Sequence, residues 1–151
     1  MHINLKNDVA LTRFIGVSIS LMFFAGCAKN WYIGEWTVTD VQFPAVSAMS
    51  NEAAVEWFGS KAIYTESLFS FREKRCQSPQ FELESLPQSE FYAAYRASFR
   101  QLNIDGDSVS LMRISCSGDS VFPGSTLVRV TDNIVYTPWD GAFFRFERSA
   151  P

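Results

Sequence analysis

The chain has 151 residues, of which 47% are hydrophobic and 15% aromatic, and its formal net charge is −3. This length suits one compact domain with its own core, and the mildly acidic balance argues against a nucleic-acid binder, which needs a basic face to neutralise phosphates. The only histidine is His2. A chain without a further imidazole cannot form a Ser-His-Asp or Cys-His site or a histidine-ligated zinc site, so we expect no catalytic residues, cofactor or metal.

The N-terminal segment is typical of an export signal. Lys6 and Arg13 precede an apolar run over residues 14–25, and small residues stand directly before Cys27. A charged lead, an apolar core and small residues at the break describe a secretory signal peptide. The core is too short to span a bilayer of about 30 Å as a stable helix. We therefore expect residues 1–26 to be removed during export.

With Cys27 at the break, this segment resembles the signal of bacterial lipoproteins, in which a lipobox ends at a Cys. The resemblance implies that the Cys27 sulfur is lipidated, that the chain is cut before it, and that the new amino group is acylated. Residues 27–32 would then tether the body to the membrane, at the periplasmic face of the outer membrane. Trp31 and Tyr32 in this tether either rest among the headgroups or fill one end of the core. The alternative is an ordinary signal cut near residues 25–26.

Short strands and one helix are predicted after the tether. Residues 33–43 form a strand with a bulge or bend near Asp40, where the apolar side of the alternation changes. A short helix follows over residues 50–59, with Ser50 as its N-cap. Further strands are predicted over residues 61–66, 68–73 and 81–84.

A second helix and four more strands are predicted in the rest of the chain. Apolar spacing indicates a helix over residues 89–100, and Asp105-Gly106 marks a turn. Strands follow over residues 109–116, 127–131, 134–137 and 142–148, the last three as a meander. Together these elements predict a mainly β (α+β) domain over residues 33–151. We expect a small antiparallel barrel of eight strands, with the two helices filling or capping it.

Cys76 and Cys116 are the two cysteines left once Cys27 carries lipid. In the oxidising periplasm such a pair usually forms a disulfide, which is our prediction here. Two buried free thiols are the alternative. A redox pair is disfavoured because the chain contains no Cys-x-x-Cys motif.

Gly34-Glu35-Trp36 opens the first predicted strand, and Arg145 and Arg148 lie on the last. This pattern resembles the signature of the lipocalins and other calycins. The resemblance implies that Gly34 and Trp36 meet an Arg from the final strand as the barrel closes, with the guanidinium over the indole. Alternation places Arg145 and Arg148 on opposite faces of the last strand, and which of them meets Trp36 stays open. The small lysozyme-inhibitor lipoproteins of bacteria, also eight-stranded barrels, resemble the chain in size, anchor and disulfide.

Two surface features are candidate partner contacts. Arg72, Lys74 and Arg75 form a basic patch, which could meet anionic lipid headgroups or an acidic partner, or could be a polar hairpin tip. Phe122 lies in a predicted loop over residues 117–125, where it is either an exposed contact or a plug for the barrel mouth.

Glu82, Glu84 and Glu90 form an acidic cluster that could supply paired carboxylates. Glu82 and Glu84 alternate with apolar residues, so a solvated strand face is the preferred interpretation. The high aromatic content either lines a cavity for an apolar ligand or fills the core of a small barrel, and core filling is favoured.

These features predict a non-enzymatic, lipid-anchored lipoprotein that binds an envelope partner through its barrel mouth and loops. One alternative is a carrier of an apolar small molecule with the same fold. The other is an inhibitor or immunity protein against an envelope-degrading enzyme. No nucleic acid is expected as a partner.

Overall fold

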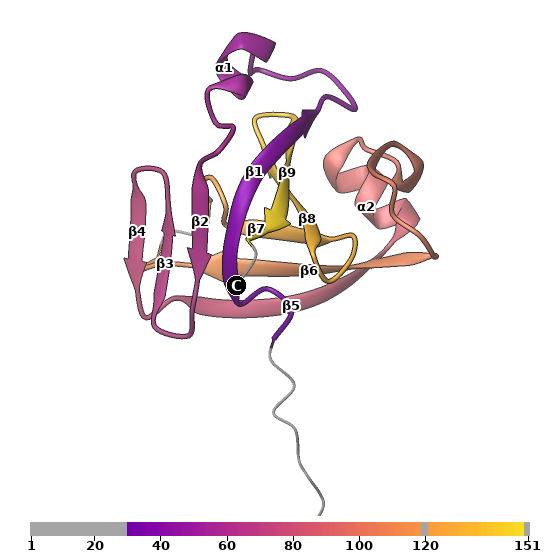
Figure 1. Ribbon diagram of the computed structural model, residues 1–151. Helices are drawn as coiled ribbons and strands as arrows, with labels where there is room; N and C mark the ends of the chain where they lie inside the picture. The colour runs from indigo at the N-terminus through magenta and orange to yellow at the C-terminus, as the bar shows by residue number, and fades with distance from the viewer. Residues whose placement is uncertain (1–29, 119–120, 150–151) are drawn as a thin grey trace, which may run out of the picture.

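The computed structural model describes residues 30–118 and 121–149 (Figure 1). They form one antiparallel sheet of nine strands, two short α-helices and a 3-10 helix. The strands are β1 (Gly34–Gln42), β2 (Lys61–Tyr64), β3 (Leu68–Phe71), β4 (Lys74–Gln77), β5 (Gln80–Pro87), β6 (Ser108–Ser115), β7 (Thr126–Arg129), β8 (Ile134–Trp139) and β9 (Ala142–Arg148). The helices are α1 (Asn51–Val55), α2 (Gln88–Tyr95) and the 3-10 helix η1 (Phe99–Leu102). Within these ranges, no helix has the length and apolarity needed to cross a membrane.

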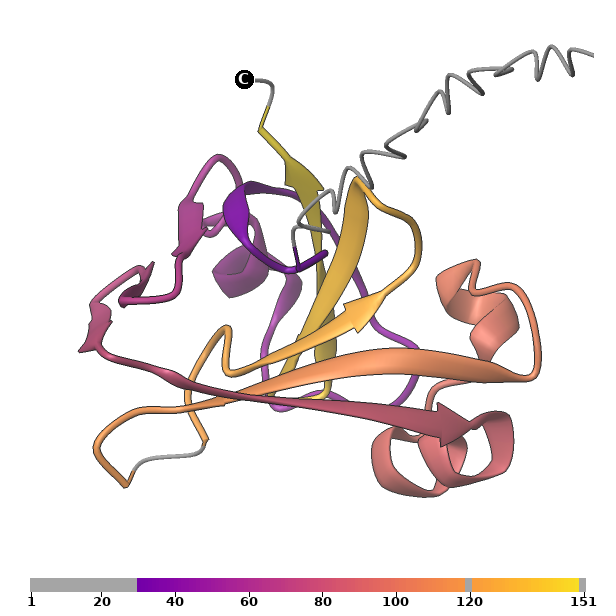
Figure 2. The same cartoon turned by 90° about the horizontal axis from the view of Figure 1, so that it is seen from below.

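The sheet is a meander that curls back on itself. Its strand order is β4-β3-β2-β1-β9-β8-β7-β6-β5, so the first and last strands pair in its middle. The result is a half-barrel in which β5 and β6 run across the direction of β1 to β4 (Figure 1, Figure 2). In the described part of the chain no pairing joins β4 to β5, although only residues 78–79 separate them. The half-barrel is therefore open along this side.

The predicted class, a mainly β chain with two short helices and a curled antiparallel sheet, is confirmed. The predicted count of eight strands is wrong, since β4 is a ninth. The β4 sequence Lys-Arg-Cys-Gln has the polar composition of a hairpin tip and a low β-propensity. Backbone pairing with β3, from Leu68 opposite Gln77 to Phe71 opposite Lys74, makes it a strand regardless of composition.

The predicted helix over residues 89–100 is wrong in its second half. α2 ends at Tyr95 because Arg96 adopts the left-handed conformation, with φ of 56°. Ser98 then starts η1: its hydroxyl accepts the N–H of Gln101, and the Gln101 side chain accepts the backbone N–H of Ser98. Such a capping box begins a new helical segment, so one apolar pattern covers two short helices.

Two local predictions near the N-terminus are confirmed. The β1–β9 register shifts between Val38 and Asp40, which is the predicted bulge. The Ser50 hydroxyl accepts the N–H of Ala53 at 3.2 Å and caps α1. α1 itself is shorter than predicted and ends at Val55.

The sheet carries a hydrophobic core on each face. Along β6, Met112 and Ile114 belong to the concave core, whereas Val109 and Leu111 belong to the outer core, as their alternation predicts. The concave core is filled by aromatic side chains. Those with at most 1% of their surface exposed are Trp36, Tyr64, Phe69, Phe71, Phe144 and Phe146.

The two helices lie on different sides of the sheet. α1 caps one end of the concave core through Ala54, and the following Trp57 stacks on Phe144 with ring centroids 4.2 Å apart. α2 and η1 pack on the outer face (Figure 1), where Phe91 meets Phe143. One helix therefore caps the half-barrel, and the other covers it from outside.

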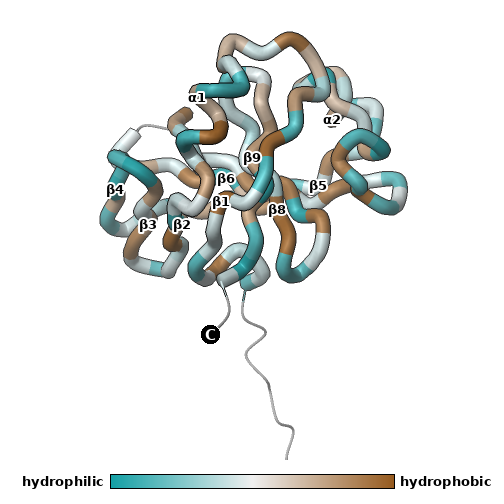
Figure 3. The backbone as a smooth tube through the Cα atoms, turned by 45° about the horizontal axis from the view of Figure 1, so that its top comes forward, coloured by the Kyte–Doolittle hydropathy of each residue, from teal (hydrophilic) through white to brown (hydrophobic). Residues whose placement is uncertain are grey.

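The connection between β1 and α1 includes hydrophobic residues, coloured brown in Figure 3. Val46 is 97% exposed. The Ser47 hydroxyl and the Ala48 N–H both donate to the carbonyl of Asp140, at 2.7 and 2.9 Å, and hold this connection against the β8–β9 turn. A loop held by these two hydrogen bonds thus exposes apolar surface at Val46.

Thr137 is an exception among the buried strand residues. It is fully buried, and its hydroxyl has no hydrogen-bond partner among the described residues. We expect Thr137→Val, which keeps the shape and removes the unpaired hydroxyl, to raise the free energy of unfolding by about 1 kcal/mol in urea denaturation. Thr39→Val is the control: the Thr39 hydroxyl donates to Glu147 at 3.2 Å in an exposed position, and its loss should lower the free energy of unfolding by about 0.5 kcal/mol or less. A loss of stability in Thr137→Val would show that the hydroxyl is paired.

Candidate binding site

Arg148 closes the end of the half-barrel where the described chain begins. Its guanidinium carbon lies 4.2 Å from the centroid of the Trp36 ring. The guanidinium donates to the carbonyls of Trp31, Ile33 and Asp132, the last two at 2.9 and 3.0 Å. Burial lowers the pKa of Arg148, and the Asp132 carboxylate opposes this shift. The side chain stays charged, because the ordinary pKa of Arg is so high.

The other candidate, Arg145, pairs with Glu147 at 3.0 Å on the face away from Trp36. Trp36 is fully buried and donates from Nε1 to the carbonyl of Tyr32 at 3.0 Å. Tyr32 packs on Phe81 with ring centroids 4.9 Å apart and is itself buried. Of the two alternatives for Tyr32, the structure thus supports filling one end of the core.

Gly34 is required by this closure. Its φ is 146°, and a Cβ atom there would lie 2.5 Å from Nη1 of Arg148. We expect Gly34→Ala to lower the free energy of unfolding by about 1–3 kcal/mol, because the backbone is strained and the guanidinium must move. Gly106→Ala is the matched control, since its φ is also positive but a Cβ atom would meet nothing within 4 Å. If Gly34→Ala and Gly106→Ala lower the free energy of unfolding equally in urea denaturation, crowding at Arg148 contributes nothing to the loss at Gly34.

Cys76 and Cys116 form the predicted disulfide, with Cα atoms 5.7 Å apart. The bond joins β4 to the residue after β6, across the open side of the half-barrel. The loop over residues 121–125 packs there as well: the Tyr64 hydroxyl donates to the carbonyl of Gly124 at 2.8 Å. Burial raises the pKa of Tyr64 well above its ordinary value. A covalent bond and a loop thus close the side that lacks a strand ladder.

Phe122 in that loop points inward. It is 6% exposed and packs on Phe69 with ring centroids 5.3 Å apart. Of the two alternatives for Phe122, this burial favours a plug over an exposed contact. Its neighbour Val121 is 80% exposed.

A hollow of about 330 Å³ lies at the β3–β4 turn beside this loop, and we call it the hairpin hollow. Its lining residues are Phe71, Arg72, Glu73, Lys74, Phe122 and Pro123. The structure thus brings together two features that the sequence indicates separately, the basic patch and the Phe122 loop.

Two cations of the hairpin hollow lie over aromatic rings. The Arg72 guanidinium carbon is 4.6 Å from the centroid of the Trp57 ring, and Lys74 Nζ is 4.9 Å from that of Phe122. Such a contact stabilises by about 0.5–2 kcal/mol and limits the motion of the charge. Arg72 has φ of 51°, in the left-handed region where Gly or Asn is usual. An Arg at this turn therefore keeps its charge over Trp57 despite backbone strain.

Arg75 is separated from these two cations. Alternation along β4 places it on the opposite face from Lys74 and Cys76, and it is exposed.

Trp57 is the residue of this site that sequence reasoning missed. No local sequence pattern indicates that Trp57 contacts Arg72, because β2 and β3 lie between the two residues in the chain.

The acidic residues of β5 flank a cation. Arg113 donates from Nε to Glu84 at 2.9 Å, and Glu82 lies opposite Arg113 in the β5–β6 register. Glu90 belongs to the first turn of α2. The preferred interpretation of Glu82 and Glu84 as a solvated strand face fits this pairing. Over residues 30–118 and 121–149, no group of three or more His, Cys, Asp or Glu side chains could hold a metal ion.

Cys27, the predicted lipidation site, and the predicted signal peptide lie outside the described residues. Comparisons with models of protein families, with curated protein sequences and with solved structures find no match to this chain. The functional conclusion therefore depends on the residues and contacts described above.

Proposed function

We propose that this protein is a lipoprotein of the bacterial cell envelope, held at the periplasmic face of the outer membrane by acylated Cys27. It acts as a non-enzymatic binding module for a partner protein with an acidic surface, and the hairpin hollow is its contact site. The observation that carries this proposal is the convergence of Arg72 and Lys74, each over an aromatic ring, at one hollow.

The composition of the hairpin hollow suits a protein interface. Arg and aromatic residues are enriched among the residues that contribute most to binding, and a cation already held over a ring loses little freedom when a partner docks. Among the residues that line the hairpin hollow, the two cations Arg72 and Lys74 outnumber the one carboxylate, Glu73. An acidic surface therefore complements the hairpin hollow.

The position of the hairpin hollow favours a partner protein over the lipid headgroups of the anchoring membrane. Gly34, near the start of the described chain, pairs with Tyr64 at one end of β2, whereas Phe71 pairs with Ala62 near the other end. Figure 1 shows the β3–β4 turn at the end of these two strands that points away from the chain start. An anchor at Cys27 would hold this turn toward the periplasm.

The filled concave core supports surface binding over transport. Trp36, Phe144 and Phe146 have no exposed surface, so a carrier would have to displace such side chains to admit a ligand. The inhibitor alternative placed its contact in the loop over residues 117–125, where Phe122 packs inward.

The closure at Trp36 supports a relation to calycin-like barrels as part of this proposal. Gly34, Trp36 and Arg148 stand in the arrangement that the calycin signature implies. The nine strands and the open side between β4 and β5 differ from a closed eight-stranded barrel. The relation is therefore proposed for the barrel closure alone.

Site-specific photo-cross-linking in cells tests the contact site. A photoreactive residue in place of Glu73, which lines the hairpin hollow, is expected to cross-link the full-length protein to a partner. The same group in place of Asn133, an exposed residue at the other end of the half-barrel, is the control and should not give that product. High salt should weaken the cross-link, because exposed charge pairs are screened.

Arg72→Gly separates binding from stability. Gly adopts the left-handed backbone more readily than Arg, which offsets the lost contact with Trp57, so the free energy of unfolding should stay within about 1 kcal/mol of the parent. Cross-linking through position 73 is expected to fall about tenfold. Arg75→Gln, on the other face of β4, should leave it unchanged. Undiminished cross-linking in Arg72→Gly would contradict the hairpin hollow as the contact site.

A further inference from the structure

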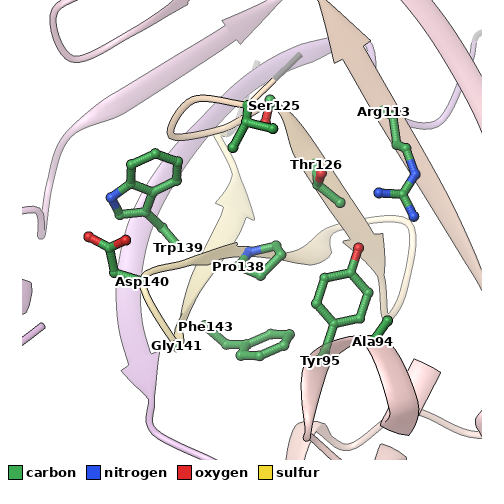
Figure 4. A pocket seen from close by; sticks show the side chains of 11 residues that line it. Ala94, Tyr95, Arg113, Ser125, Thr126, Pro138, Trp139, Asp140, Gly141 and Phe143 are labelled. Atoms are coloured by element: carbon green, nitrogen blue, oxygen red, sulfur yellow. The ribbon is translucent and has the colours of Figure 1, made fainter. Parts of the chain in front are cut away.

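A second hollow, of about 440 Å³, lies on the outer face of the sheet beside α2, and we call it the outer hollow (Figure 4). Its volume falls within the usual range of small-ligand pockets, about 300–1,000 Å³. The residues around it come from α2, β6, the loop over residues 121–125, β7 and the β8–β9 hairpin, so no single segment of the sequence indicates it.

Flat, rigid groups form the apolar part of the outer hollow. Phe143 is 1% exposed and meets Tyr95 edge to face, with ring centroids 6.1 Å apart and an interplanar angle of 76°. Pro138 and Trp139 continue this surface toward the β8–β9 turn, as Figure 4 shows. Such a surface suits a flat apolar ligand body.

Polar groups gather at one side of the outer hollow. Figure 4 shows the side chains of Arg113, Tyr95 and Thr126 together there. Arg113 donates from Nε to Glu84 at 2.9 Å and also interacts with the Tyr95 side chain. The bond to Glu84 uses Nε, so a further acceptor would bind at the terminal nitrogens, beside the Tyr95 hydroxyl. An Arg presented in this way recognises a carboxylate through two parallel hydrogen bonds.

Asp140 stands at the other side of the outer hollow, beside Trp139 (Figure 4). Its carboxylate repels an anionic group from that side. Asp140 thus favours one orientation of an anionic ligand, with the anion at Arg113 and the apolar body over Pro138 and Trp139.

We propose that the outer hollow binds a small organic carboxylate with a flat apolar body. The carboxylate pairs with Arg113 and accepts from the Tyr95 hydroxyl. This site shares no lining residue with the hairpin hollow, and it does not depend on the proposed partner binding.

A nuclear magnetic resonance titration of the isotope-labelled full chain tests this proposal with two matched probes. Hydrocinnamate and hydrocinnamamide share one body and differ in the charge of the head group. Hydrocinnamate is expected to give saturable shifts of the backbone amide signals of Tyr95, Thr126 and Phe143 at millimolar concentration. The neutral amide is expected to bind about tenfold more weakly.

Three variants assign the effect to the outer hollow. Arg113→Gln should weaken hydrocinnamate binding about tenfold and leave the binding of the amide unchanged. Tyr95→Phe keeps the ring but loses the hydroxyl, and it should weaken hydrocinnamate binding about threefold. Arg145→Gln removes a cation that lies outside the outer hollow and should have no effect. Equal affinity for the two probes, no saturable shift, or an equal loss in Arg145→Gln would each overturn the proposal.

Discussion

Phe144→Ala is expected to lower the free energy of unfolding by about 3–5 kcal/mol. Phe144 has no exposed surface and stacks on Trp57 with an interplanar angle of 12°. Its strand, β9, is paired with β1 on one side and β8 on the other. The backbone around the lost ring is therefore held on both sides and cannot collapse into the cavity. Urea denaturation followed by tryptophan fluorescence measures the change.

Phe43→Ala is the matched control for that measurement. Phe43 is 37% exposed, so the same truncation should lower the free energy of unfolding by only about 1–2 kcal/mol. A comparably small loss in Phe144→Ala would mean that the concave core is loosely filled. That result would favour the carrier alternative over surface binding.

Breaking the disulfide is expected to lower the free energy of unfolding by about 4 kcal/mol. The bond between Cys76 and Cys116 closes a loop of 40 residues, and chain entropy gives about this value for such a loop. No strand pairing joins β4 to β5 over the described residues, so β4 is the strand that the bond holds most directly. The double variant Cys76→Ser, Cys116→Ser, compared with the oxidised parent in urea, measures the loss.

Hydrogen exchange in the same double variant shows where the loss falls. The amides of β4 should exchange faster than in the parent. The exchange rates of the β9 amides should change least, because β9 is paired on both sides. An unchanged free energy of unfolding in the double variant would contradict a structural role for the bond.

The features that could be predicted from the sequence are those that neighbouring residues decide. Leu111 and Met112 face opposite cores because side chains alternate along any strand. The turn at Asp140-Gly141 has φ of 50° and 83°, which Asp and Gly tolerate better than most residues. The bulge before Asp40 is visible as a change in the apolar side of the alternation.

The features that could not be predicted depend on distant parts of the chain. β4 exists because β3 pairs with it and because Cys76 is bonded to Cys116, and neither fact is visible in its polar composition. Alternation separates Arg145 from Arg148, but only the direction in which the sheet curls decides that Arg148 meets Trp36.

The residues of the candidate site could be predicted better than their grouping. Arg72 and Lys74 are visible as a basic patch, yet their positions over Trp57 and Phe122 follow from the packing of α1 and of the loop over residues 121–125. Phe122 stands where a turn is expected, and sequence alone does not show whether such a ring points outward or into the open side of a half-barrel.

Attachment through Cys27 is the claim on which the proposed role depends. Mass spectrometry of the N-terminal peptide, isolated from the membrane fraction, tests it most directly. We expect a peptide that begins at Cys27 and carries the added mass of a diacylglycerol and an acyl chain, and a Cys27→Ser protein that leaves the membrane fraction. A peptide with an unmodified Cys27 thiol, or a Cys27→Ser protein that still fractionates with membranes, would contradict a lipid-anchored binding module.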